Sequence, residues 1–114
     1  MSIEAITETE FERFADDTLR NLERALDGVD HIEVDLQMGV LTIEFSDGTR
    51  YVVNSHRAAK QIWMAAEHTA WHFDPGSQGR EWRANKDGSE LWSTVEAALS
   101  RKLGTTITLA RRKA

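Results

Sequence analysis

The sequence predicts an α+β fold in which an N-terminal and a C-terminal helix enclose an antiparallel sheet. Apolar residues follow the 3.6-residue period of a helix over residues 7–26 and again over 89–103. Between these segments, over residues 32–53, apolar and polar residues alternate with the period of 2 that is typical of half-buried strands. No repeat or Pro/Ser-rich linker divides the chain, so residues 1–114 are expected to form a single domain.

The first helix is expected from about Thr7 to Leu26. Thr7 or Thr9 can cap its first turn, and Glu10 follows Thr7 by three residues, as in a capping box. Gly28 stands just past its end. The residues predicted to form its core-facing side are Phe11, Phe14, Ala15, Thr18, Leu19, Leu22, Ala25 and Leu26.

The alternating segments predict an antiparallel meander. Its first two strands are Ile32–Leu36 and Leu41–Phe45, with a turn at residues 38–39 between them. The Asp-Gly pair at 47–48 is a signal for a two-residue hairpin loop, and it leads to a third strand over residues 51–54.

The second half of the chain contains two further strand candidates and a helix. Trp71–Asp74 and Glu81–Ala84 have strand-like composition. A helix is expected over Ser89–Leu103, because its apolar residues share one face and Gly104 follows its last turn. Ile107 and Leu109 alternate with polar residues, so we expect the C-terminal segment to dock on the core.

Residues 57–68 are ambiguous. Their Ala, Lys, Gln, Met and Glu residues favour a helix, whereas Ile62 and Met64, alternating with polar neighbours, fit a strand. In a strand, Trp63 would lie on the outer sheet face beside Asn54, where an aromatic side chain is typical of an interface anchor. In a helix, Trp63 would simply be a core residue.

Composition excludes several classes of function. The chain has no Cys, which rules out a disulfide framework, a thiolate nucleophile and a cysteine-bound zinc or cluster. Neither a membrane-length apolar run nor a signal peptide is present, so a cytoplasmic protein without membrane contact is expected. No glycine-rich phosphate loop or nucleophile elbow occurs. Basic residues are not interleaved with aromatics, so nucleic-acid binding is not expected.

Negative charge is concentrated in the first part of the chain. Residues 1–47 hold 13 acidic and 3 basic residues, a net charge of −10, whereas residues 48–114 carry a net charge of +5. On a helical wheel with Phe11 at zero, four acids of the first helix fall between about 100° and 160°, in one stripe beside the apolar face. If the first strand is the neighbour of this flank, its outward acids extend the stripe, and His31 alternates with them. We call the following eight residues the acidic ridge: Glu8, Glu12, Asp16, Glu23, Asp27, His31, Glu33 and Asp35.

The acidic ridge has three interpretations on its pattern alone. Carboxylates four residues apart lie roughly 6 Å apart along a helix, so two of them hold a hard cation only with water completing its shell. The same charges could serve as a docking surface for a basic protein, or simply as a solvated flank that keeps the protein soluble. Oxygen ligands suit several cations, so the spacing names no metal.

The order and identity of these segments resemble the frataxin family. Residues 39–49 are similar to the second and third strands of the family, and Asn54 followed by residues 61–65 is similar to its most recognisable block. The similarity runs from about Glu8 to Leu109 and is greatest to the bacterial branch, the CyaY proteins. It continues through residues 72–74, 81–82, 87–88 and 91–92.

The resemblance implies a two-layer α/β sandwich, with both helices packed on one face of an antiparallel sheet of five to six strands. Residues 61–66 would then be a strand with Trp63 on the exposed sheet face. It also implies weak binding of Fe²⁺ or Fe³⁺ by the acidic ridge, where Glu12 replaces the His of a relative. The expected partners are the cysteine desulfurase and scaffold of iron–sulfur cluster assembly. The residues expected to contact them are Asn54, Trp63, Glu23 and Asp27.

The chain departs from the family pattern at two positions. The chain has His56 where the family usually has Gln and Ala58 where it usually has Pro, which affects the expected scaffold contact. A monomer is expected, with iron-dependent oligomerisation as an open alternative. A regulator or iron donor without a fixed active site is the leading hypothesis. The alternatives are a metal-independent acidic interaction module and an iron-oxidising protein, since weak ferroxidase activity is attributed to some frataxins.

Overall fold

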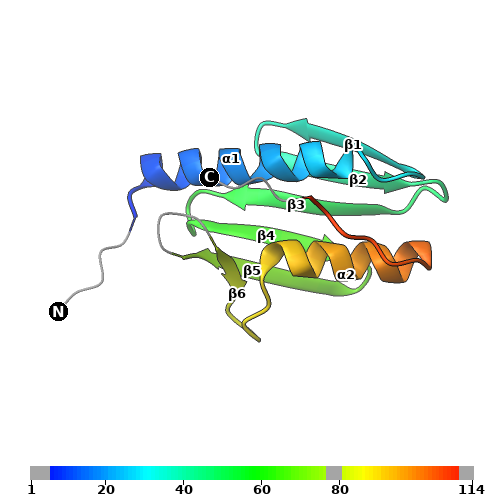
Figure 1. The fold of residues 1–114 in the computed structure, drawn as a ribbon. Coiled ribbons are helices and arrows are strands. Elements are labelled where there is room, and N and C mark those ends of the chain that lie inside the picture. Colours follow the sequence, from blue (N-terminus) through cyan, green and yellow to red (C-terminus); the bar gives the residue numbers. More distant parts are fainter. Residues whose placement is uncertain (1–5, 77–80, 111–114) are drawn as a thin grey trace.

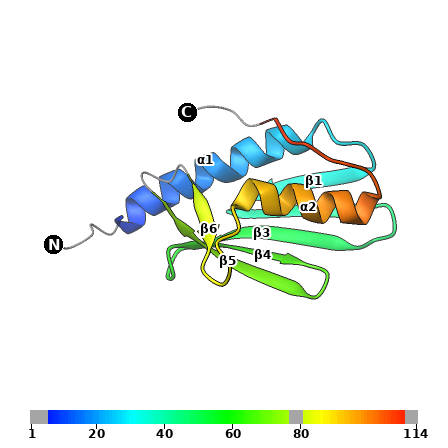
Figure 2. The same ribbon diagram turned by 60° about the horizontal axis from the view of Figure 1, so that its bottom comes forward.

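Two helices cover one face of a six-stranded antiparallel sheet in the computed structural model, which describes residues 6–76 and 81–110 (Figure 1). The strands follow one another in the sheet in chain order, from β1 at one edge to β6 at the other. The turned view in Figure 2 shows both helices on the same side of the sheet, so the predicted two-layer sandwich is confirmed. The elements are α1 (Glu8–Leu26), β1 (Ile32–Gln37), β2 (Val40–Phe45), β3 (Arg50–His56), β4 (Gln61–Ala66), β5 (Thr69–Pro75), β6 (Trp82–Ala84) and α2 (Leu91–Leu103).

Helix α1 begins with the predicted capping box. The Thr7 hydroxyl accepts a hydrogen bond from the Glu10 N–H at 3.1 Å, and the Glu10 carboxylate accepts one from the Thr7 N–H at 2.9 Å. These two bonds satisfy donors that the first helical turn leaves free. Of the predicted core face, Phe14 and Ala25 are only half-buried, and the remaining six residues are buried.

The turn between β1 and β2 fixes the register of the edge strand. Met38 and Gly39 both have positive φ, 51° and 79°, as a two-residue hairpin turn with the twist of the sheet requires. Gln37 therefore pairs with Val40, and the same register places Glu33 opposite Glu44. The apolar residues of β1 face the helices and its acidic residues face the opposite side of the sheet.

The β2–β3 hairpin is confirmed, but its loop is longer than the two residues expected. The Gly48 N–H donates to the Phe45 carbonyl at 2.9 Å, and the Phe45 N–H donates to the Thr49 carbonyl at 2.9 Å. The Asp47 carboxylate stabilises this loop, because it accepts a hydrogen bond from the Thr49 N–H and also binds Lys102 of α2 at 2.7 Å. Both contacts hold the pKa of Asp47 well below its usual range, the Lys102 hydrogen bond contributing most.

The ambiguous segment is divided into a turn and strand β4. Ile62, Met64 and Ala66 are buried beneath the helices, and β4 pairs with β3 on one side and β5 on the other. Partners on both sides and a buried face outweigh the helical propensity of the residues.

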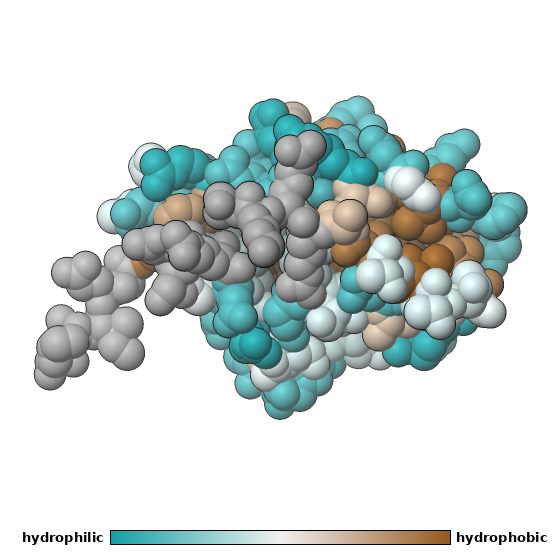
Figure 3. All heavy atoms as spheres, in the orientation of Figure 1, coloured by the Kyte–Doolittle hydropathy of each residue, from teal (hydrophilic) through white to brown (hydrophobic). Residues whose placement is uncertain are grey.

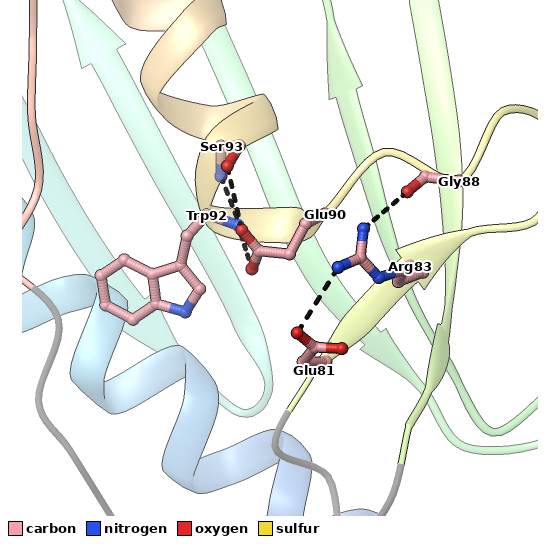
Figure 4. Close-up of polar contacts among 6 residues, drawn as sticks. All are labelled: Glu81, Arg83, Gly88, Glu90, Trp92 and Ser93. Atoms are coloured by element: carbon pink, nitrogen blue, oxygen red, sulfur yellow. Dashed lines mark hydrogen bonds and ion pairs between the residues drawn. The ribbon is translucent and has the colours of Figure 1, made fainter.

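Helix α2 begins two residues later than predicted. Glu90 is its N-cap, and the carboxylate of Glu90 accepts hydrogen bonds from the Trp92 and Ser93 N–H groups (Figure 4). Ser89 does not begin the helix, because its carbonyl accepts a hydrogen bond from the Ala84 N–H and its own N–H donates to Asp87. The helix ends as expected at Gly104, whose φ of 72° is the left-handed conformation of a C-cap.

The core lies between the two layers and includes the C-terminal segment. Leu109 is 4% exposed and packs with the core, while Ile107 is half-buried. Backbone hydrogen bonds hold both residues against α2: the Leu109 N–H donates to the Glu96 carboxylate, and the Ile107 N–H donates to the Ser100 hydroxyl. On the helix side, apolar atoms reach the surface toward the C-terminal end of α2 (Figure 3). Neither α1 nor α2 combines the length and apolar composition that a membrane-crossing helix needs.

Candidate functional site

Two carboxylates in the first half of the acidic ridge have basic partners. Glu12 forms an ion pair with Arg57 at 3.0 Å, and Asp16 forms one with Arg20, one turn along α1, at 2.8 Å. All four side chains are about half-exposed or more, so water screens these pairs. The N-terminal half of the ridge is therefore partly neutralised.

The C-terminal half of α1 carries acids without such partners. Glu23 and Asp27 lie one turn apart, and neither forms an ion pair with any residue in the ranges that the structure describes. The C-terminal end of a helix has a partial negative charge, so an acid there is unfavourable by roughly 0.3–1 kcal/mol. Helix stability therefore does not account for these carboxylates, and they leave a strong negative potential at this end of α1.

Strand β1 continues the negative charge along the sheet edge. The chain leaves α1 and returns beside it as β1, which brings His31 and Glu33 to the end where α1 stops (Figure 1). Glu33 and Asp35 are exposed and lie on the side of the sheet that faces away from the helices. The ridge thus passes around the sheet edge, from the helical layer to the open face.

A hollow of about 400 Å³ lies at this end of the β1–β2 hairpin. Its lining includes His31, Glu33, Glu44 and Phe45. Glu44 was not among the predicted site residues. The predicted turn at residues 38–39 is a signal for it, because a two-residue turn there places Glu44 directly opposite Glu33. Like charges across a strand pair repel, and Glu44 relieves this in part through Arg50 at 3.8 Å.

The ridge is an extended row of separate carboxylates. Glu8 and Asp27 are 19 residues apart, which corresponds to about 28 Å along the helix axis at 1.5 Å per residue. Within residues 6–76 and 81–110, no three His, Asp or Glu side chains come together closely enough to hold a metal ion. Any cation on the ridge would keep much of its water shell and exchange readily.

The open face of the sheet holds the two other predicted residues, Asn54 and Trp63, directly opposite each other on β3 and β4. Trp63 is half-buried, because its indole lies between two imidazoles that no local sequence signal connects with it. The ring of His56 stacks on one side, with centroids 3.9 Å apart, and the ring of His72 on the other, at 4.3 Å. The interplanar angles are 13° and 15°.

Exposed apolar residues extend this face toward the β1–β2 turn. The register places Val40, Asn54, Trp63 and His72 in one row across four strands. Val40 is 41% exposed, and Met38 at the turn is fully exposed. Large apolar side chains beside a half-buried Trp are typical of a protein-binding surface.

The fold and these two surfaces define a two-layer α/β protein with an acidic helix–strand edge and an aromatic sheet face. The family model of the frataxin-like domain matches residues 4–105, and the chain belongs to this family. Among solved structures, the frataxin of Psychromonas ingrahamii, a member of the CyaY family, is similar with a TM-score of 0.82 and 23% identity, over 90% of this chain and 97% of that one.

Two yeast frataxin structures are also similar to this chain. A trimeric frataxin of Saccharomyces cerevisiae, complexed with ferrous iron, matches with a TM-score of 0.63 and 25% identity, over 92% of this chain and 94% of that one. A yeast frataxin matches with a TM-score of 0.64 and 26% identity, over 89% of this chain and 97% of that one.

Proposed function

We propose that this chain is an iron-binding accessory protein of iron–sulfur cluster assembly in the cytoplasm, which regulates the complex of cysteine desulfurase and scaffold or donates iron to it. Membership of the frataxin family supports an iron-related function. The observation that carries the proposal is the pair of carboxylates Glu23 and Asp27, which form no ion pair within the described residues and lie beside the acidic edge of β1. Such a surface attracts both cations and basic proteins.

Iron is cargo in this proposal, and the carboxylates fit it. Carboxylate oxygens are suitable ligands for ferrous and ferric iron, and the related yeast frataxin is complexed with ferrous iron. Two acids one turn apart supply only part of a coordination shell, so water supplies the remainder and binding is weak. Weak binding suits a protein that passes a metal on.

The proposed partners use the two surfaces described above. The unpartnered end of the ridge, at Glu23 and Asp27, docks on a basic patch of the desulfurase, and the sheet face around Asn54 and Trp63 contacts the scaffold. Because iron and the basic patch are attracted to the same carboxylates, each is expected to weaken binding of the other.

The docking of the ridge is tested by charge reversal. The double variant Glu23→Lys with Asp27→Lys is expected to bind the desulfurase at least tenfold more weakly, measured by calorimetry at low salt, because it changes the charge at the contact by four units, from −2 to +2. The matched control is Asp17→Lys with Glu81→Lys, which makes the same change of net charge at exposed positions off the ridge. An equal loss in both variants, or no loss in the first, would contradict ridge docking.

The binding of iron is tested by anaerobic titration of Fe²⁺ while backbone amide signals are followed by NMR. Residues 23–35 are expected to show the largest shifts and broadening, and Glu23→Gln with Asp27→Gln is expected to remove them at the helix end. Signals that change only elsewhere, or not at all, would argue against iron on this surface.

A second candidate, a metal-independent acidic interaction module, is favoured by the lack of any three converging ligand side chains in the described ranges. It predicts that desulfurase binding weakens strongly with salt and that iron has no effect on it. Partner binding measured with and without Fe²⁺ at constant ionic strength separates the two candidates, because only the iron-binding protein shows competition.

A further inference from the structure

Three aromatic rings form a continuous stack on the open sheet face. His72 lies directly opposite Trp63 on β5, whereas His56 lies diagonally across on β3, next to the residue pair Asn54 and Trp63. The centroid distances of 3.9 Å and 4.3 Å leave no room for another ring against either face of the indole. A partner that covers Trp63 must therefore meet the edges of the stack, including both imidazoles.

Hydrogen bonds hold the edges of the stack. The Trp63 indole N–H donates to the Gln61 side-chain oxygen at 2.8 Å, and the Gln61 amide donates to the Asp74 carboxylate at 2.9 Å. On the other side, the Ala59 N–H donates to Nδ1 of His56 at 3.3 Å. In this arrangement Nδ1 is the hydrogen-bond acceptor, which leaves Nε2 as the ring nitrogen that can donate.

The charged groups around the stack are already engaged elsewhere. Asp74 reaches the indole only through Gln61, and it faces Arg83 of β6, which is turned toward Gly88 and Glu81. In the turn before β4, Arg57 is held by Glu12, and Lys60 is the last residue of that turn. Neither imidazole forms an ion pair with a carboxylate in the described part of the chain.

We propose that His56 and His72 are positioning residues that clamp Trp63, and that protonation of this clamp weakens partner binding at the sheet face. The inference rests on the proposed function, in which Trp63 contacts the scaffold. Protonation of the clamp puts charge into the centre of the contact, and covering a charge without a partner is costly. An added proton on Nδ1 of His56 would also break the hydrogen bond from Ala59.

Among side chains, imidazole is the one that ordinarily gains its proton near neutral pH, and this sets the pH range of the test. An imidazole that must be neutral in the complex lowers the apparent affinity up to tenfold for each pH unit below its own pKa in the free protein. The clamp thus gives the face a preference for neutral over mildly acidic conditions.

The test separates clamping from protonation with two double variants. His56→Phe with His72→Phe keeps rings on both sides of the indole and removes the titrating groups. His56→Ala with His72→Ala removes the flanking rings as well as the titrating groups. Affinity for the scaffold is measured by calorimetry between pH 7.5 and 5.5, and the indole N–H signal of Trp63, assigned with Trp63→Phe, reports its exchange with water.

The unaltered protein is expected to lose affinity at least tenfold more between pH 7.5 and 5.5 than the Phe variant, since titration of the scaffold itself is common to both. The Ala variant is expected to bind severalfold more weakly at pH 7.5 and to show faster exchange of the Trp63 N–H. Equal pH profiles in the unaltered protein and the Phe variant would overturn the clamp as a proton sensor while leaving scaffold docking intact. No scaffold binding at pH 7.5 by the unaltered, folded protein would overturn the docking function and this inference together.

Discussion

A buried hydrogen bond between Thr18 and Trp82 ties the acidic helix to the far edge of the sheet, and its removal should destabilise the whole protein. The Trp82 indole N–H donates to the Thr18 hydroxyl at 2.9 Å, and that hydroxyl donates onward to the Phe14 carbonyl at 2.8 Å. Trp82 is 1% exposed and also makes an edge-to-face contact with Phe11. Water cannot replace the hydroxyl at such a site.

The variant Thr18→Val keeps the shape of the side chain and removes the acceptor. A buried donor left without an acceptor costs about 1–3 kcal/mol, so we expect the free energy of unfolding to fall by about 2 kcal/mol. With an unfolding entropy of about 2.1 cal/mol/K per residue over 114 residues, each kcal/mol lowers Tm by about 4 °C. The expected decrease in Tm is therefore about 8 °C, measured by calorimetry and by urea unfolding.

The control variant Thr18→Ser keeps the hydroxyl and loses only a methyl group, which should cost about 0.8 kcal/mol. A double-mutant cycle with Trp82→Phe isolates the bond, because Thr18→Val should be nearly neutral once the indole N–H is absent. The reasoning fails if Thr18→Val and Thr18→Ser are equally destabilising, or if the cost of Thr18→Val is the same in the Trp82→Phe background.

Two further predictions concern Tyr51 and Leu109. Burial, followed by the hydrogen bond to Glu67, raises the pKa of Tyr51 to about 12, so the only tyrosine of the chain should ionise about two pH units late in an ultraviolet absorbance titration. Because the folded state holds this proton more tightly, the associated stability is present below about pH 10 and lost as pH rises through 12. Ionisation of Tyr51 near pH 10, as for an exposed tyrosine, would refute the raised pKa. Leu109→Ala should lower the free energy of unfolding by about 2 kcal/mol in urea titrations through loss of core contacts, whereas exposed Thr108→Ala should change it little; equal effects would contradict the docking of this segment.

Local sequence signals predicted most elements of the fold. The capping box at Thr7, the alternation in the first three strands and Gly104 after α2 each act over a few residues, so each could be recognised without tertiary information. Strand β4 could not be settled in this way. Its residues favour a helix, and only the pairing with β3 and β5 makes it a strand, which the family resemblance supplied.

The start of α2 shows a second limit of local reasoning. Ser89 is a good N-cap by residue type, but Ala84 and Asp87 bind its backbone, and the isolated bridge between Arg83 and Glu90 keeps the chain extended for two more residues. Competition of this kind depends on contacts that form after the sheet has assembled.

The candidate site was predictable in its parts and unpredictable in its contacts. A helical wheel could group the acids of α1, but the neutralisation of Glu12 by Arg57 joins residues 45 positions apart and follows from the fold alone. The same holds for the stack around Trp63, since His56 and His72 come from strands on either side. The aromatic side chain that was predicted to be exposed is the middle one of three ordered rings.

The acidic edge and the aromatic stack are connected by the sheet itself. The row that contains Trp63 continues through Asn54 and Val40 to Gln37 on β1, two residues from Asp35. Adjacent strands are about 4.8 Å apart, so about 14 Å separates the backbone of β1 from that of β4 along this row. A partner that covers the stack therefore reaches the acidic edge with a contact of ordinary size. In the proposed function, this proximity would let one partner contact the aromatic stack and the acidic residues of β1 at the same time.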